Sequence, residues 1–255
     1  MTKKTFTYQA LTDDLVQNRQ QDYQLPADYP WELPVRTTRV RTIRALCGAA
    51  AFCYSRLWRG VTVVGAEKLA PFAHQGYLVY GNHTQPVNDV ALPYLIGGPQ
   101  HFYALAAPAN WGLPIRRLLR PGGAIPVAKN LRESRAMLAA IRQALAFEGH
   151  LFIYPEAHVW PGYTKIRPFP ATSFRFAVEA AVPVFTLTTT YQGWRLPGQA
   201  RLVAYVDGPF EAPAGLNARA SRQWLHDQVF TQMQARAALN TIEPYHYQER
   251  RVSDD

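Results

Sequence analysis

Short apolar runs that alternate with helical patterns constrain the fold of this chain more than any other feature of its sequence. Six runs have the length and composition of strands, at residues 61–64, 77–80, 124–127, 151–154, 184–190 and 201–206. One connecting helix is well marked, because Asn130 can cap it, Glu133 follows three residues later and Gly149 lies past its end. The alternation predicts an α/β fold: a single domain with a mixed, largely parallel sheet flanked by helices.

Composition divides the chain into four segments. Residues 1–35 are polar and punctuated by prolines, which predicts an extended N-terminal arm on the surface. Residues 36–60 carry apolar side chains close to helical spacing, which predicts an amphipathic helix before the α/β domain. The domain itself is expected over residues 61–242, with a last helix at about 217–239, and a polar tail follows at 243–255.

The amphipathic segment is a candidate for membrane contact. Trp58 and arginines on both sides of an apolar middle are typical of a helix in a lipid interface. Those arginines are Arg36, Arg39, Arg41, Arg44, Arg56 and Arg59. Alternatively, the helix packs on the protein's own core and its arginines are solvated; the two interpretations are compatible. The longest uncharged apolar run, roughly residues 45–55, falls well below the ~20 residues of a membrane-spanning helix, so no span is predicted.

The net charge of +9 fits three kinds of partner: nucleic acid, an anionic membrane surface or a phosphorylated substrate. The basic residues are dispersed and no nucleic-acid recognition motif accompanies them, so we expect an anionic membrane surface and no nucleic acid. One local group is mixed with apolar residues, which suits a headgroup interface or the mouth of an acyl site. It consists of Arg116, Arg117 and Arg120.

Neither a disulfide framework nor a metal site is expected. Cys47 and Cys53 lie in an apolar stretch without neighbours at ligand spacing. Four histidines are candidates for a metal cluster, but their spacings match no familiar ligand motif. These are His74, His83, His101 and His158. The polar start of the sequence lacks the features of a secretory signal, so we expect a cytoplasmic protein that is peripheral on the inner face of the cell membrane.

The most informative segment is a strand that ends abruptly in Gly81, Asn82 and His83. Sites are built where polar groups follow an α/β strand. Pro86 suits the first turn of the next helix, which leaves His83 in the connecting loop and Asp89 in the first turns. Such a pair can act as a general base, because the carboxylate orients the imidazole and stabilises its charged form. The alternative is an ordinary hydrogen bond within a loop.

Four ordered segments carry a family resemblance: Gly81-Asn82-His83 with a following acid, then GAIPVAK at 123–129, LFIYPE at 151–156 and VPV at 182–184. Over roughly residues 61–210 the chain resembles the glycerolipid (lysophospholipid) acyltransferase family. The resemblance implies an α/β domain with an N-terminal membrane-associated helix. It also implies acyl transfer from acyl-CoA or acyl-carrier protein, as co-substrate, to a hydroxyl of a lysophospholipid or related alcohol, without a further cofactor. Residues 61–242 would then be the acyltransferase domain.

The resemblance implies a role for each matching residue. His83 would deprotonate the acceptor hydroxyl, which attacks the thioester directly, and Asp89 would orient His83. The family spacing places the acid one residue earlier, where this chain has Asn88. One residue turns a helical side chain by about 100°, so only one of the two can face His83. We favour Asp89, because a carboxylate offsets the charge that develops on imidazole.

Four further residues are candidates for substrate binding. Lys129 stands where the family has an arginine that pairs with acceptor phosphate, and the alternative is a solvated loop lysine. Glu156 matches the third segment as an acceptor-site or loop-positioning residue. Asn82 belongs to the first segment, and His158 lies where the family continues Gly-Thr-Arg after the glutamate.

The arginine of the family's Gly-Thr-Arg is absent from this chain, so the identity of the acceptor is not determined. Lys165 and Arg167 are candidates, besides His158, to make its contacts. Lysophosphatidate is the default acceptor by resemblance, and a glycolipid or another alcohol is the alternative. The competing function is a non-catalytic membrane-surface protein that binds lipid in the same cleft.

Overall fold

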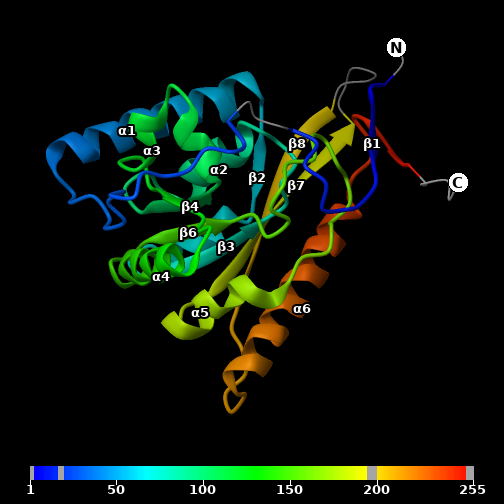
Figure 1. The fold of residues 1–255 in the computed structure, drawn as a ribbon. Helices are drawn as coiled ribbons and strands as arrows, with labels where there is room; N and C mark the ends of the chain where they lie inside the picture. The colour runs from blue at the N-terminus through cyan, green and yellow to red at the C-terminus, as the bar shows by residue number, and fades with distance from the viewer. Residues whose placement is uncertain (1–2, 17–19, 194–199, 251–255) are drawn as a thin grey trace, which may run out of the picture.

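The computed structural model describes residues 3–16, 20–193 and 200–250, and shows a seven-stranded sheet between two layers of helices (Figure 1). The strand order is β2-β8-β7-β3-β6-β4-β5, and every neighbouring pair is parallel except β7 with β8. The predicted mixed, largely parallel sheet is therefore confirmed. The strands are β2 Thr62–Val64, β3 Tyr77–Gly81, β4 Phe102–Ala106, β5 Ala124–Pro126, β6 His150–Ile153, β7 Val184–Gly193 and β8 Ala200–Phe210.

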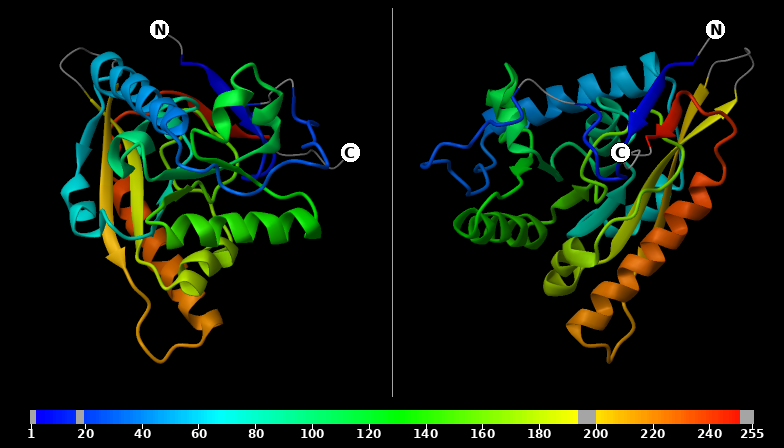
Figure 2. Two further views of the ribbon diagram at one scale, coloured as in Figure 1. Left: turned by 90° about the vertical axis from the view of Figure 1, so that its left-hand side faces the viewer. Right: turned by 45° about the vertical axis from the view of Figure 1, so that its right-hand side comes forward.

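The helices cover both faces of this sheet, with α1 and α2 on one side and α4, α5 and α6 on the other (Figures 1 and 2). α4 begins where the sequence predicts, because the side chain of Asn130 accepts the backbone N–H of Glu133. The α-helices are α1 Thr38–Phe52, α2 Asn88–Gly97, α3 Arg116–Leu119, α4 Leu131–Ala146, α5 Arg175–Ala180 and α6 Ala218–Ala237. Shorter helical turns are η1 Cys53–Trp58, η2 Ala66–Phe72, η3 Pro108–Gly112 and η4 Ala171–Phe174.

The central strand β3 divides the core into two parts. Leu78 and Tyr80 face the layer of α4, α5 and α6, whereas Tyr77 and Val79 face the layer of α1 and α2. All five residues of β3 are buried, because helices cover both faces and leave no side for polar residues. This explains why the strand appears in the sequence as an unbroken apolar run that ends at the first polar residue, Asn82.

Three strands were not predicted from the sequence. β4 lies inside the sheet between β5 and β6. The other two are in the segments predicted as a polar arm and a polar tail. β1, Thr5–Tyr8, pairs in parallel with β9, His246–Glu249, so the two ends of the chain form a small sheet of their own.

One of the arginines that the sequence predicts to face lipid or solvent is instead buried inside the protein. Arg44 is buried, and its guanidinium donates to the backbone carbonyls of Gln100, Phe102 and Pro121. It therefore anchors α1 to the start of β4 inside the protein. Among the helices in the described ranges, none is both long and apolar enough to cross a bilayer.

Candidate active site

The candidate site lies at the carboxyl ends of β3 and β6, which are neighbours in the sheet. His83 follows β3 by two residues, and Tyr154 and Glu156 follow β6. Parallel strands bring their carboxyl ends to one edge, so loops far apart in the sequence meet there. The sheet thus supplies the framework for the side chains described below.

His83 and Asp89 are in direct contact. The Nδ1 atom of His83 lies 2.8 Å from Oδ2 of Asp89, and the backbone N–H of Gln85 donates to the same oxygen at 2.8 Å. Burial raises the pKa of Asp89 above its ordinary value, and the hydrogen bonds from His83 and from the backbone oppose this. Among the described residues none bonds Nε2 of His83, whose side chain is 18% exposed. The geometry presents Nε2 as the nitrogen that can exchange a proton.

Asn88, the alternative partner of His83, faces a different element. Its side chain is completely buried, and its Oδ1 accepts the hydroxyl of Ser55 in η1 at 2.8 Å. The helix therefore turns Asp89 toward His83 and Asn88 toward the end of the α1 layer. The one-residue difference in spacing from the family pattern leaves the acid in contact with the histidine.

Tyr154 packs against the imidazole ring of His83. It was not predicted as a site residue. Its ring stacks on His83 with centroids 4.5 Å apart, and its hydroxyl donates to the backbone carbonyl of Asp89. Burial raises the pKa of Tyr154 well above its ordinary value, so the phenol remains a donor. Gly81 is required beneath it, because a Cβ at that position would lie 2.6 Å from the tyrosine ring. An aromatic residue after a buried strand gives no sequence signal that distinguishes this role from core packing.

Glu156 holds the backbone of His83 from inside the protein. Its Oε2 accepts the N–H of His83 at 3.2 Å and the guanidinium of Arg167 at 3.1 Å, while its Oε1 accepts the backbone N–H of Arg167 at 2.9 Å. The side chains of Glu156 and Arg167 are 0% and 1% exposed, respectively. These contacts fit the loop-positioning alternative for Glu156, and its contact with an acceptor stays a prediction.

Asn82 is bonded within the framework of the sheet, and its contact with substrate stays a prediction. Its Nδ2 donates to the carbonyl of Thr189 at 3.0 Å, and its Oδ1 accepts the N–H of Thr189 at 2.8 Å. The buried amide thereby continues the pairing of β3 with β7 for one more residue. The side chain is 3% exposed, and each of its polar ends makes one hydrogen bond to Thr189.

Lys129 and His158 contact the N-terminal arm. Lys129 is exposed, and its Nζ donates to the backbone carbonyl of Tyr23 at 3.0 Å. His158 is 40% exposed, and its Nδ1 lies 3.5 Å from a carboxylate oxygen of Asp14. Both side chains remain accessible from solvent, so their predicted contacts with substrate stay predictions.

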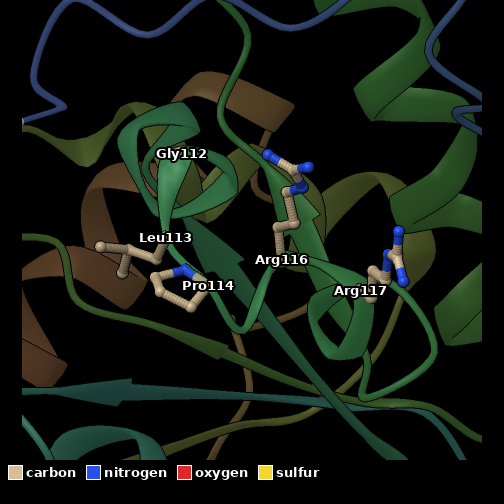
Figure 3. Close-up of a pocket in the computed structure, with 5 residues that line it drawn as sticks. All are labelled: Gly112, Leu113, Pro114, Arg116 and Arg117. Atoms are coloured by element: carbon tan, nitrogen blue, oxygen red, sulfur yellow. The ribbon is translucent and has the colours of Figure 1, made fainter.

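A pocket of about 380 Å³ lies on the connection between β4 and β5. Gly112, Leu113 and Pro114 line it together with Arg116 and Arg117, and Figure 3 shows the two guanidinium groups extending from the turn that these residues form. The pocket therefore combines apolar walls with two cations, the mixture that the sequence indicates for this segment. The third arginine of the group, Arg120, instead donates to the backbone carbonyl of Glu32.

Substitutions at Asp89 and Asn88 are expected to separate the two candidate partners of His83. Asp89→Asn removes the carboxylate that stabilises a charged imidazole, and kcat should fall by about 10²-fold. Asn88→Ala removes the hydrogen bond to Ser55 and should cost about 1 kcal/mol of stability, with kcat changed only slightly. Steady-state kinetics and thermal unfolding of both variants check this. A larger loss of kcat in Asn88→Ala would make Asn88 the working partner.

Comparisons with known proteins identify the family and the fold. A family model described as Acyltransferase matches residues 60–190, about half of the chain. Among solved structures, the crystal structure of the 1-acyl-sn-glycerophosphate (LPA) acyltransferase PlsC from Thermotoga maritima has the same fold, with a TM-score of 0.53 and 18% sequence identity over 80% of this chain and 84% of that chain. A search of curated protein sequences found no match. The extent of the family match shows that the chain belongs to the acyltransferase family.

Proposed function

We propose that the protein transfers a fatty acyl group from an acyl thioester to a hydroxyl of a glycerolipid-type acceptor. The observation that carries this proposal is the 2.8 Å contact between His83 and Asp89 at the sheet edge of an acyltransferase-family domain. A histidine that a buried carboxylate orients is suited to take a proton from a hydroxyl. The acceptor alcohol then supplies the nucleophile, so no serine of the protein is needed.

In the proposed reaction the thioester carbonyl carbon gains a bond to oxygen and loses its bond to sulfur. Nε2 of His83 takes the proton of the acceptor hydroxyl while its oxygen attacks the thioester carbonyl carbon, and Asp89 stabilises the imidazolium that forms. The tetrahedral intermediate then releases the thiolate as its carbon–sulfur bond breaks. The imidazolium returns its proton to the thiolate, which leaves an ester, a free thiol and neutral His83.

The proposed default acceptor is lysophosphatidate, by likeness to PlsC, and the proposed donor is acyl-CoA or acyl-carrier protein. Both donors are anionic, and the net charge of +9 favours their approach. Lys129 is the proposed contact for the acceptor phosphate, because its ammonium is exposed beside the capped start of α4.

The Lys129 contact gives a test of acceptor charge. Lys129→Ala is expected to raise KM for a phosphorylated acceptor by about tenfold, the value of one charge-assisted hydrogen bond. KM for an uncharged alcohol should change little. Initial rates with lysophosphatidate and with a monoacylglycerol provide the comparison. Equal changes for both acceptors would remove Lys129 from phosphate binding.

We also propose that η1 and the end of α1 bind to the anionic inner face of the cell membrane. Leu57 and Trp58 are 71% and 83% exposed, and Arg56 and Arg59 lie beside them in the sequence. Large exposed apolar side chains between arginines combine burial in lipid with attraction to anionic headgroups.

Vesicle binding tests this surface. Leu57→Ser is expected to weaken binding to anionic phospholipid vesicles by about tenfold, because one buried leucine contributes about 1.5–3 kcal/mol. Leu131→Ser is the matched control, since Leu131 is also 71% exposed but begins α4 on the opposite layer. Vesicle sedimentation of both variants provides the measurement. If the two variants lose affinity equally, η1 is not the contact surface.

The proposed activity is tested by mass spectrometry of products. Purified protein is incubated with acyl-CoA or acyl-carrier protein and a panel of lysophospholipids, glycolipids and simple alcohols. An acylated product that is lost in His83→Ala supports the proposal and names the acceptor class. If neither donor gives product while the folded protein binds lipid vesicles, the protein is a non-catalytic lipid-binding protein.

A further inference from the structure

The two ends of the chain meet beside the candidate active site. β1 and β9 pair over four residues, and we call this pair the terminal ribbon (Figure 2). Its aromatic side chains pack on the loop that follows Glu156. Tyr8 of β1 and Tyr247 of β9 both contact the ring of Trp160, and the Tyr247 hydroxyl donates to the carbonyl of Pro161 at 2.6 Å.

Trp160 is the residue on which the ends of the chain converge. It is completely buried, and its ring is stacked on that of Tyr247, with centroids 5.3 Å apart and planes inclined by 2°. The centroid of Tyr8 lies 4.8 Å away, and Nε1 donates to the backbone carbonyl of Asp13 in the arm at 2.8 Å. Residues near both ends of the sequence thus hold one tryptophan.

The same tryptophan is joined to His83 by two routes. Directly, the backbone N–H of Trp160 donates to the carbonyl of His83 at 2.9 Å. Indirectly, the guanidinium of Arg167 lies 4.8 Å from the centroid of the Trp160 ring and binds Glu156, which accepts the N–H of His83. The backbone N–H and C=O of His83 are therefore both bonded to the loop that contains Glu156 and Trp160, and the terminal ribbon packs on this loop.

We propose that Trp160 is a positioning residue for His83 and that the terminal ribbon acts through it on the reaction. This proposal rests on the proposed role of His83 as the base. His83 lies in a connecting loop, where two soft backbone dihedrals per residue would otherwise let the imidazole move. A displacement of about 1 Å in a catalytic group can cost about 10²-fold in rate. The loop that holds both peptide groups of His83 therefore has a direct effect on kcat.

Trp160→Leu is the decisive variant, because it removes the aromatic stack and the bond to Asp13 but keeps the backbone N–H. The expected result is a loss of about 10²-fold in kcat with KM for the acyl donor changed by less than about threefold. Trp160→Phe, which keeps an aromatic ring, should recover most of the loss. Tyr247→Leu, which changes only the ribbon, should reproduce part of it.

A control and a second measurement separate positioning from general destabilisation. Phe176→Leu shortens a buried aromatic side chain in α5, which packs in the core beside α4 and α6. It should lower the midpoint of thermal unfolding without lowering kcat below that midpoint. Hydrogen–deuterium exchange of the peptide spanning residues 81–89 should be about tenfold faster in Trp160→Leu than in the wild type and unchanged in Phe176→Leu.

These outcomes decide the proposal even if the proposed function fails. If the wild type has no acyltransferase activity, hydrogen–deuterium exchange still shows whether Trp160 orders the segment that contains His83. The proposal is overturned if Trp160→Leu leaves exchange at residues 81–89 unchanged. It is also overturned if Trp160→Leu retains kcat within about threefold of an active wild type, or if Phe176→Leu loses kcat to the same extent.

Discussion

His83→Ala is expected to lower kcat by about 10³-fold, because general acid–base catalysis by a positioned side chain contributes about 10²–10⁴-fold. The variant loses the nitrogen that we propose takes the acceptor proton, and it loses the contact between Asp89 and the imidazole. In free energy the loss corresponds to about 4 kcal/mol of transition-state stabilisation. The fold should survive, since Asp89 keeps the backbone N–H of Gln85 and the side chain of His83 reaches the surface.

A second histidine provides the control for this substitution. His74 is exposed on the loop before β3, and His74→Ala should leave kcat unchanged. Product formation by mass spectrometry and the midpoint of thermal unfolding are measured for both variants. An equal loss in the two variants, or a His83→Ala enzyme within tenfold of the wild type, would exclude His83 as the base.

The sequence predicted the framework of the site well because that framework is built from local patterns. β3 and β6 are buried on both faces and appear as unbroken apolar runs, and the capping box of Asn130 and Glu133 marks the start of α4. The same local pattern made His83 and Asp89 candidates, since a polar loop follows a buried strand and a helix follows Pro86, whereas their catalytic roles came from the family resemblance.

The polar partners were harder to predict because a sequence does not say where a side chain points. Asn82 and Glu156 look like ligand-binding residues at strand ends, yet Thr189 and Arg167 occupy them. These pairings join elements that only tertiary structure brings together. β1 and β9 present the same difficulty, because each is a mixed four-residue strand at an opposite end of the chain and has no apolar run to announce it.

Arg167→Met is expected to destabilise the protein by about 3–5 kcal/mol, the cost of leaving one charge of a buried ion pair without its partner. The substitution keeps side-chain length while it removes the cation that Glu156 contacts at 3.1 Å. It also removes the guanidinium bond to the carbonyl of Leu11 in the arm and the bond to the carbonyl of His158 in the loop after Glu156. Urea unfolding at constant pH measures the change.

The pH dependence identifies Glu156 as the source of this loss. Burial already raises the pKa of Glu156 above its ordinary value of 4.5, and removing Arg167 takes away the largest opposing influence. A carboxyl group with a raised pKa in the folded state favours folding below its unfolded pKa, and that contribution is lost as pH rises through the folded pKa. The deficit of Arg167→Met relative to the wild type should therefore be small near pH 4 and should grow as the pH rises toward 7.

Glu156→Gln combined with Arg167→Met completes the test, because it leaves no uncompensated charge. The double variant should lose less stability at pH 7 than Arg167→Met alone, and its deficit should not grow between pH 4 and pH 7. A positive coupling of this kind locates the cost in the buried carboxylate. If the double variant is instead less stable than either single variant at every pH, the hydrogen bonds of Glu156 to the backbone of His83 and Arg167 contribute more to folding than the ion pair does.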